Sequence, residues 1–109
     1  MWDDLDDIDA YQREACRTVN RDLAPDMRLA TAAMGLANEA GEAGGIVRKH
    51  LEQGHTLDTA KLSAELGDVL WYVATLADAV GLTLSDVARG NIEKLRKRYP
   101  DGGFSEEAS

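Results

Sequence analysis

Apolar residues recur along the chain at the three- and four-residue spacing of amphipathic helices, in four segments separated by short breaks. The predicted helices cover residues 4–23, 28–52, 58–80 and 84–99. No segment shows the sustained alternation of apolar and polar residues that is typical of a half-buried strand. Because short breaks make successive helices antiparallel neighbours, the pattern predicts an all-α, up-and-down four-helix bundle.

The breaks between the predicted helices contain residues that commonly begin or end a helix. Pro25 lies in the first break and Gly54 in the second. At the third break, Thr83 and Asp86 have the spacing of a capping box, with Asp in place of Glu. Pro100 ends the last predicted helix. These signals agree with the boundaries that the periodicity indicates.

The third predicted helix is apolar on more than one face. One continuous stripe runs along it, made of Leu62, Leu66, Val69, Val73, Leu76 and Val80. Trp71 lies on the opposite side of that helix by helical-wheel arithmetic. A four-helix monomer of this size can barely cover both faces, so we expect at least a homodimer.

The second predicted helix carries four glycines, each of which costs up to about 1 kcal/mol relative to Ala in a helix interior. They are Gly35, Gly41, Gly44 and Gly45. Close approach of a neighbouring helix is the packing reason that we expect for them.

An acidic pattern repeats on the second and third predicted helices, which contain the octapeptides LANEAGEA and LSAELGDV. Glu39 and Glu42 of the first octapeptide correspond to Glu65 and Asp68 of the second. Within each helix the two acids lie on the same side of the apolar stripe. If the helices are antiparallel, Glu42 comes level with Glu65, and Glu39 with Asp68. Four carboxylates should therefore converge on one side of the hairpin.

Four uncompensated carboxylates raise one another's pKa and destabilise the fold, and a divalent cation would remove this repulsion. All-oxygen ligation favours Mg²⁺ or Mn²⁺. Iron is disfavoured, because neither acidic pair contains the histidine of the Glu-x-x-His arrangement found in di-iron bundles. His50 and His55 lie near the hairpin turn, where we expect surface or loop residues. The alternative interpretation is that the acids are solvated helix faces without a metal.

Asn91, Lys94 and Arg98 share one flank of the fourth predicted helix. Lys94 as a point charge and Asn91 as a hydrogen-bond donor could bind phosphate oxygens that a metal does not reach. The alternative is a basic last turn that complements the helix dipole, which suits Arg96 and Lys97 better.

Size and charge narrow the class of protein further. A chain of 109 residues with 44% apolar residues is the size of one domain, which we expect to span residues 1–109 with an acidic, Gly-rich tail from about residue 101. The net charge of −8 argues against a nucleic-acid polymer as partner. The acidic N-terminus is unlike a signal peptide, and no apolar run is long enough for a membrane span. We therefore expect a cytoplasmic protein with no membrane partner. We expect its single cysteine, Cys16, to be a buried and inert thiol.

Together these motifs resemble the MazG-like all-α nucleotide pyrophosphohydrolases over about residues 28–104. The resemblance rests on Glu39-Ala-Gly-Glu42, then Glu65-Leu-Gly-Asp68-Val-Leu-Trp-Tyr, then Asn91-Ile-Glu-Lys94-Leu-Arg-Lys-Arg-Tyr-Pro100. It implies a four-helix fold that assembles as a dimer or tetramer, with Mg²⁺ held by the four acids. It also implies hydrolysis of a nucleoside or deoxynucleoside triphosphate to the monophosphate and pyrophosphate, as in cleansing of the nucleotide pool. By the same resemblance, Asn91 and Lys94 would contact the triphosphate.

The sequence departs from some relatives at one position. Those relatives carry a further Glu just before the position of Glu39, and this residue is proposed as their general base. This chain has Asn38 there, which cannot accept a proton at neutral pH. We therefore expect Glu39 or Glu42 to assist a water molecule that the metal activates.

Base recognition and rival functions complete the expectations. Trp71 or Tyr72 could stack a nucleobase, and an oligomer contact is the alternative for Trp71. A phosphoribosyl-ATP pyrophosphohydrolase would use similar acids on another substrate. A non-catalytic helical interaction module, with the acids as a charged face, is the alternative from a different class.

Overall fold

The computed structural model describes residues 7–104 and residue 106, and within them it consists of α-helices without a strand. The helices are α1 (Ile8–Cys16), α2 (Pro25–Gln53), α3 (Thr59–Ala79) and α4 (Leu84–Arg98). The predicted all-α class is therefore confirmed. Residues 4–6 of the first predicted helix lie outside the described residues.

The first helix is shorter than predicted, because side chains take up the carbonyl groups at its C-terminal end. The hydroxyl of Thr18 donates to the backbone oxygen of Ala15 at 2.7 Å, and the guanidinium of Arg21 donates to that of Cys16 at 3.1 Å. Side chains that bond nearby backbone groups compete with helix continuation. Residues 17–24 therefore form turns where the periodicity predicted a helix up to residue 23.

The other helix ends follow the predicted signals with one exception. Pro25 lies within α2 as its first residue rather than in a break, because the N–H that proline lacks would have no helical partner at this position. Thr83 caps α4 as predicted, since its hydroxyl accepts from the backbone N–H of Asp86 at 3.1 Å. The carboxylate of Asp86 pairs with Arg89 at 2.7 Å.

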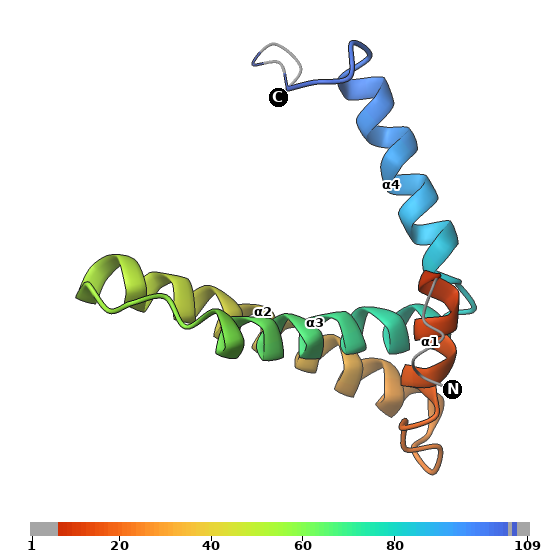
Figure 1. Cartoon of the computed structure of the whole chain (residues 1–109). Helices are drawn as coiled ribbons and strands as arrows, with labels where there is room; N and C mark the ends of the chain where they lie inside the picture. The colour runs from red at the N-terminus through yellow and green to blue at the C-terminus, as the bar shows by residue number, and fades with distance from the viewer. Residues whose placement is uncertain (1–6, 105, 107–109) are drawn as a thin grey trace.

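α2 and α3 lie side by side and run in opposite directions, joined by a short connection that begins at Gly54 (Figure 1). The closest approach is at Gly35, where an added Cβ would lie 2.2 Å from the ring of Tyr72. Close helix packing, the expected reason for the glycines of α2, is thus confirmed at Gly35. The same explanation is wrong for three other glycines within one chain, because an added Cβ would meet nothing within 4 Å at Gly41, Gly44 or Gly45.

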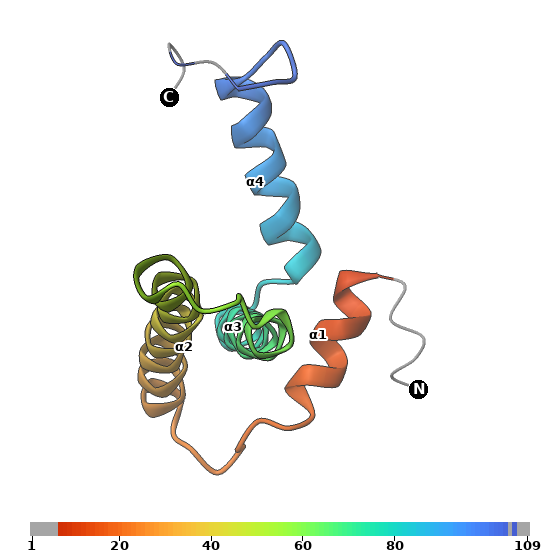
Figure 2. The ribbon, with the colours of Figure 1, turned by 60° about the vertical axis from the view of Figure 1, so that its left-hand side comes forward.

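α4 does not close a bundle with the other helices of its own chain. It makes an angle of 102° with α3 and contacts α1 and α3 but not α2 (Figures 1 and 2). The predicted up-and-down bundle is therefore not formed by a single chain. Among the described residues, no single helix is long and apolar enough to cross a membrane; α3 and α4 meet that criterion only as a bent pair.

The small core lies where α1 meets α3 and the start of α4, and Gln12 is its buried polar centre. The Gln12 amide nitrogen donates to the backbone oxygens of Ala74 and Leu82 at 3.1 and 3.0 Å. Its amide oxygen accepts from the backbone N–H of Leu84 at 3.1 Å. Apolar packing around it comes from small residues and one leucine: Ala15, Ala74, Ala77 and Leu84. Gln12 thereby fixes the corner from which α4 projects.

Cys16 is buried next to this core, as the sequence predicted. Burial raises the pKa of its thiol, and the nearby charge of Asp78 raises that pKa further. A thiol with a raised pKa is less often the reactive thiolate.

Large apolar side chains stay exposed in the single chain. Among the described residues no large side chain is fully buried, and the exposed large apolar residues of α3 and α4 are Leu66, Leu70, Val87, Ile92 and Leu95. A groove of about 560 Å³ lies where these two helices meet. Its apolar lining residues are Ile8, Leu70, Val73, Leu84, Val87 and Ala88, and Asn91 and Lys94 also line it.

Candidate metal centre

Three of the four predicted acids meet across the α2–α3 hairpin. One carboxylate oxygen from each of Glu39, Glu42 and Glu65 lies within 4.8 Å of the others. The two α2 acids are one turn apart on one helix face, and the antiparallel neighbour brings Glu65 level with them. Asp68 is exposed and lies outside this trio, although its charge is near enough to raise the pKa of Glu39.

The trio is electrostatically strained when no cation is bound. The pKa of Glu39 is raised to about 7, firstly because its side chain hydrogen-bonds that of Glu65 and then because it is partly withdrawn from water. The charges of Glu42, Glu65 and Asp68 raise this pKa further. The surroundings of Glu39 therefore favour its protonated form when no cation is bound.

Two oxygens of the trio also lack partners. One carboxylate oxygen of Glu39 and one of Glu65 are buried without any hydrogen bond. A buried polar atom without a partner costs free energy, and a coordinated cation would satisfy both oxygens. Three carboxylates without histidine or cysteine are a hard, all-oxygen donor set, which fits Mg²⁺ or Mn²⁺. The residues present therefore fit a divalent metal.

Tyr11 is a neighbour of this centre that the sequence analysis missed. It projects from α1, and its pKa is raised by burial and then by the charge of Asp68. α1 packs against α3, which places the Tyr11 ring near the exposed end of the acidic row. No motif marks Tyr11, because its place depends on the contact between two helices far apart in sequence.

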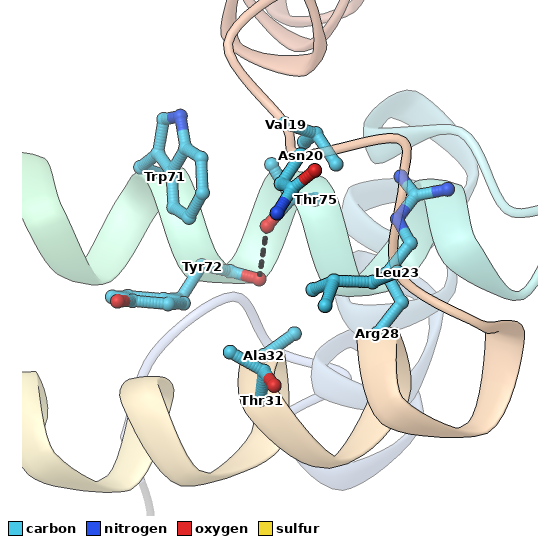
Figure 3. A pocket seen from close by; sticks show the side chains of 9 residues that line it. All are labelled: Val19, Asn20, Leu23, Arg28, Thr31, Ala32, Trp71, Tyr72 and Thr75. Atoms are coloured by element: carbon cyan, nitrogen blue, oxygen red, sulfur yellow. Dashed lines mark hydrogen bonds between the residues drawn. The ribbon is translucent and has the colours of Figure 1, made fainter.

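An aromatic pocket opens one helical turn beyond Asp68, where Trp71 and Tyr72 sit edge to face with ring centres 4.9 Å apart (Figure 3). The pocket has a volume of about 120 Å³; its other lining residues are Val19, Asn20, Leu23, Arg28, Thr31, Ala32 and Thr75. Trp71 donates its indole N–H to the hydroxyl of Thr18 at 2.8 Å. The chain's own turn at residues 17–24 thus holds Trp71, which the sequence placed on a back face of α3.

Arg28 is the cation nearest this pocket, and it is already paired. Its guanidinium donates to the carboxylate of Asp78 at 3.0 Å, and its Nε is buried without a partner. Arg28 thus lines the pocket and has one buried N–H without a hydrogen-bond partner.

The predicted phosphate-binding residues Asn91, Lys94 and Arg98 are exposed on α4. Because α4 turns away at Gly81, which has a left-handed φ of 79°, and makes no contact with α2, one chain does not bring them to the carboxylates. His50 and His55 lie at the closed end of the hairpin, where the His50 ring contacts the backbone oxygen of His55.

The helical hairpin with its carboxylate trio defines an all-α protein whose donor set fits a divalent cation. Comparison with known proteins narrows this class. Residues 28–103 match the sequence profile of the MazG nucleotide pyrophosphohydrolase domain, and the chain belongs to this family. All four acids and the three α4 residues lie within the matched range.

Two curated relatives are similar over most of their length. The Gene 37 protein of Mycobacterium phage L5 is 39% identical over 103 residues, covering 87% of this chain and 90% of that protein. The uncharacterized protein YvdC of Bacillus subtilis is 36% identical over 73 residues, covering 59% of this chain and 69% of that protein. No solved structure gives a significant match.

Proposed function

We propose that this protein hydrolyses nucleoside or deoxynucleoside triphosphates to the monophosphate and pyrophosphate, with Mg²⁺ as cofactor and Mn²⁺ as a possible substitute. The observation that carries the proposal is the trio of Glu39, Glu42 and Glu65, with two buried oxygens that lack partners. Membership of the MazG nucleotide pyrophosphohydrolase family supports the reaction class.

The metal ligands that we propose are the trio and Asp68. Asp68 lies one turn beyond Glu65 on α3, and its exposed carboxylate is the natural fourth donor once a cation neutralises the row. When bound, the cation neutralises phosphate charge and activates the attacking water. Asn38 is exposed and cannot accept a proton, so Glu39 and Glu42 are the carboxylates that we propose as catalytic.

The aromatic pocket is the proposed site for the base. Trp71 and Tyr72 offer ring faces for stacking, and Tyr72 lies four residues beyond Asp68 on the same face of α3.

We also propose that the protein acts as a homodimer or homotetramer. The exposed apolar residues of α3 and α4 leave a groove that a second copy would cover. A second copy would also give Asn91, Lys94 and Arg98 a route to a triphosphate at this centre, because α4 of the same chain points away from it.

Turnover of the eight common nucleoside and deoxynucleoside triphosphates, with and without Mg²⁺, tests the proposal. Monophosphate plus pyrophosphate is scored separately from diphosphate plus phosphate. Mg²⁺-dependent release of pyrophosphate is the expected result, and the ranking of substrates gives the base preference. No turnover together with Mg²⁺-independent thermal stability would refute it in favour of a helical interaction module, because a metal that binds the native state raises the melting temperature. Turnover of phosphoribosyl-ATP alone would identify the related activity on that substrate.

A further inference from the structure

A hollow of about 310 Å³ lies beside the carboxylates, on the side of the hairpin connection. Its charged residues are Glu42 and Glu65 together with Arg48, Lys49 and Lys61. In a chain with a net charge of −8, this gathers three cations next to the acids. The hollow is lined from α2 and α3 alone, so a single chain forms it.

Helical spacing puts the two lysines in line with the acids. Lys49 lies seven residues after Glu42 on α2, and Lys61 lies four residues before Glu65 on α3, so each lysine shares a helix face with its acid. Because the helices run in opposite directions, both steps lead toward the hairpin connection. Both lysines therefore lie on the connection side of the metal centre, Lys61 about one turn and Lys49 about two turns from the acids, and both line the hollow.

Gly45 keeps the hollow open. It lies on α2 between Glu42 and Lys49, and an added Cβ there would meet nothing within 4 Å. A glycine costs about 1 kcal/mol in a helix interior. Close packing against α3 does not explain why the chain has a glycine at this position.

The two lysines have their charges available for a ligand. Arg48 pairs with Glu52 at 3.1 Å. Lys49 and Lys61 are exposed, and neither forms an ion pair within the part of the chain that the structure describes. A lysine ammonium is a compact point charge with three donors, which suits the oxygens of a phosphate chain.

From these observations we infer that Lys49 and Lys61 bind the two terminal phosphates of the triphosphate and the pyrophosphate that leaves. The inference rests on the proposed function and deepens it. The aromatic pocket lies on the other side of the carboxylates, at Tyr72 and Ala32. A nucleotide with its base in that pocket and its first phosphate at the metal centre directs its remaining phosphates into the hollow. This site needs no residue from α4.

Binding of inorganic pyrophosphate in the presence of Mg²⁺, measured by titration calorimetry on the full chain, tests the inference. The variants are Lys49→Gln, Lys61→Gln and both together, with Lys97→Gln on α4 as a control of equal charge change. We expect each single variant to weaken pyrophosphate binding by roughly 10- to 100-fold, as for the loss of a charged hydrogen bond. The stabilisation of each variant by Mg²⁺ alone should be unchanged. Equal pyrophosphate affinity in the double variant and in Lys97→Gln would overturn the inference.

A second variant fills the hollow without removing charge. Gly45→Leu should fold, because the space around this position is open, and should weaken pyrophosphate binding while its melting temperature stays at or above that of the parent. Unchanged affinity in a folded Gly45→Leu protein would refute the site. Pyrophosphate binding that depends on the lysines without any triphosphate turnover would uphold the site and refute the proposed function. Triphosphate turnover without lysine-dependent binding of pyrophosphate would uphold the proposed function and refute the site.

Discussion

Gly35 on α2 faces the ring of Tyr72 on α3 so closely that an added Cβ would lie 2.2 Å from the Cε1 atom of that ring. This contact sets the distance between the two helices that carry the acids. Glu39 lies one turn after Gly35, and Glu65 lies about two turns before Tyr72. Two features therefore depend on this contact: the distance between the carboxylates, and the aromatic pocket.

Gly35→Ala should destabilise the protein by about 1–3 kcal/mol, because the added methyl group forces the Tyr72 ring or the helix to move. It should also weaken the Mg²⁺-induced rise in melting temperature. Gly41→Ala is the matched control, since nothing lies within 4 Å of an added Cβ, and it should stabilise the protein by about 0.5–1 kcal/mol. Urea denaturation measures both. Equal stability of the two variants would contradict the contact.

Gln12→Ala should cost about 2–4 kcal/mol, because it leaves the backbone oxygen of Leu82 and the backbone N–H of Leu84 without their partner in the core. Hydrogen exchange should then increase at the start of α4, which Gln12 holds against α3. Arg13→Ala removes an exposed neighbour and is the control. If α4 amides exchange equally in both variants, Gln12 does not hold the corner.

The metal-free protein should lose stability as the pH rises from about 4.5 to about 7. Glu39 has its pKa raised to about 7 in the folded chain, so the folded state holds this proton more tightly than the unfolded state, whose group titrates near 4.5. A carboxyl whose pKa is raised favours the fold at low pH and opposes it above the folded pKa. Melting temperatures in a chelating buffer across this range measure the effect. Glu39→Gln should flatten the profile, and an unchanged profile would argue against the raised pKa of Glu39.

Glu39→Gln should abolish triphosphate hydrolysis, by roughly 100-fold or more, while it stabilises the metal-free protein by removing repulsion in the trio. Steady-state kinetics and thermal melting in chelator give the two readouts. Retained activity would remove Glu39 from the proposed site.

Asp68→Asn tests the acid that the trio leaves out. If Asp68 becomes a ligand when the cation binds, the variant should weaken Mg²⁺ binding by roughly 10- to 100-fold, the range seen when groups that support metal ligands are lost. Mg²⁺ titration followed by melting temperature measures it. Asp86→Asn on α4 is a control with the same change of charge, and an equal effect in both would assign Asp68 to the solvated surface.

Ile92→Glu should shift the protein toward the monomer mass of 11.8 kDa in light scattering, because a charge in an apolar interface is costly. Lys97→Glu is the control, because it changes the charge of α4 nearby without replacing an apolar residue. If both variants keep the parent mass, the exposed face of α4 is not the contact between copies.

The sequence by itself determined three of the four helices closely and three of the four acids that meet, because these depend on local rules. Helix periodicity and the cap at Thr83 follow from neighbours within one or two turns. The repeated acidic pattern and the short connection at Gly54 together predict which acids meet. Glu39, Glu42 and Glu65 meet as expected, whereas Asp68, the expected fourth member, lies outside the trio.

Only the tertiary structure decided the direction of α4 and the surroundings of the acids. The 102° angle between α3 and α4 depends on Gln12, which bonds backbone groups more than 60 residues away. Packing of α1 and its following turn on α3 brings Tyr11 near enough for the charge of Asp68 to raise its pKa, and lets Thr18 accept a hydrogen bond from Trp71. No periodicity records such contacts, because they depend on how finished helices fit together and not on the spacing within one of them.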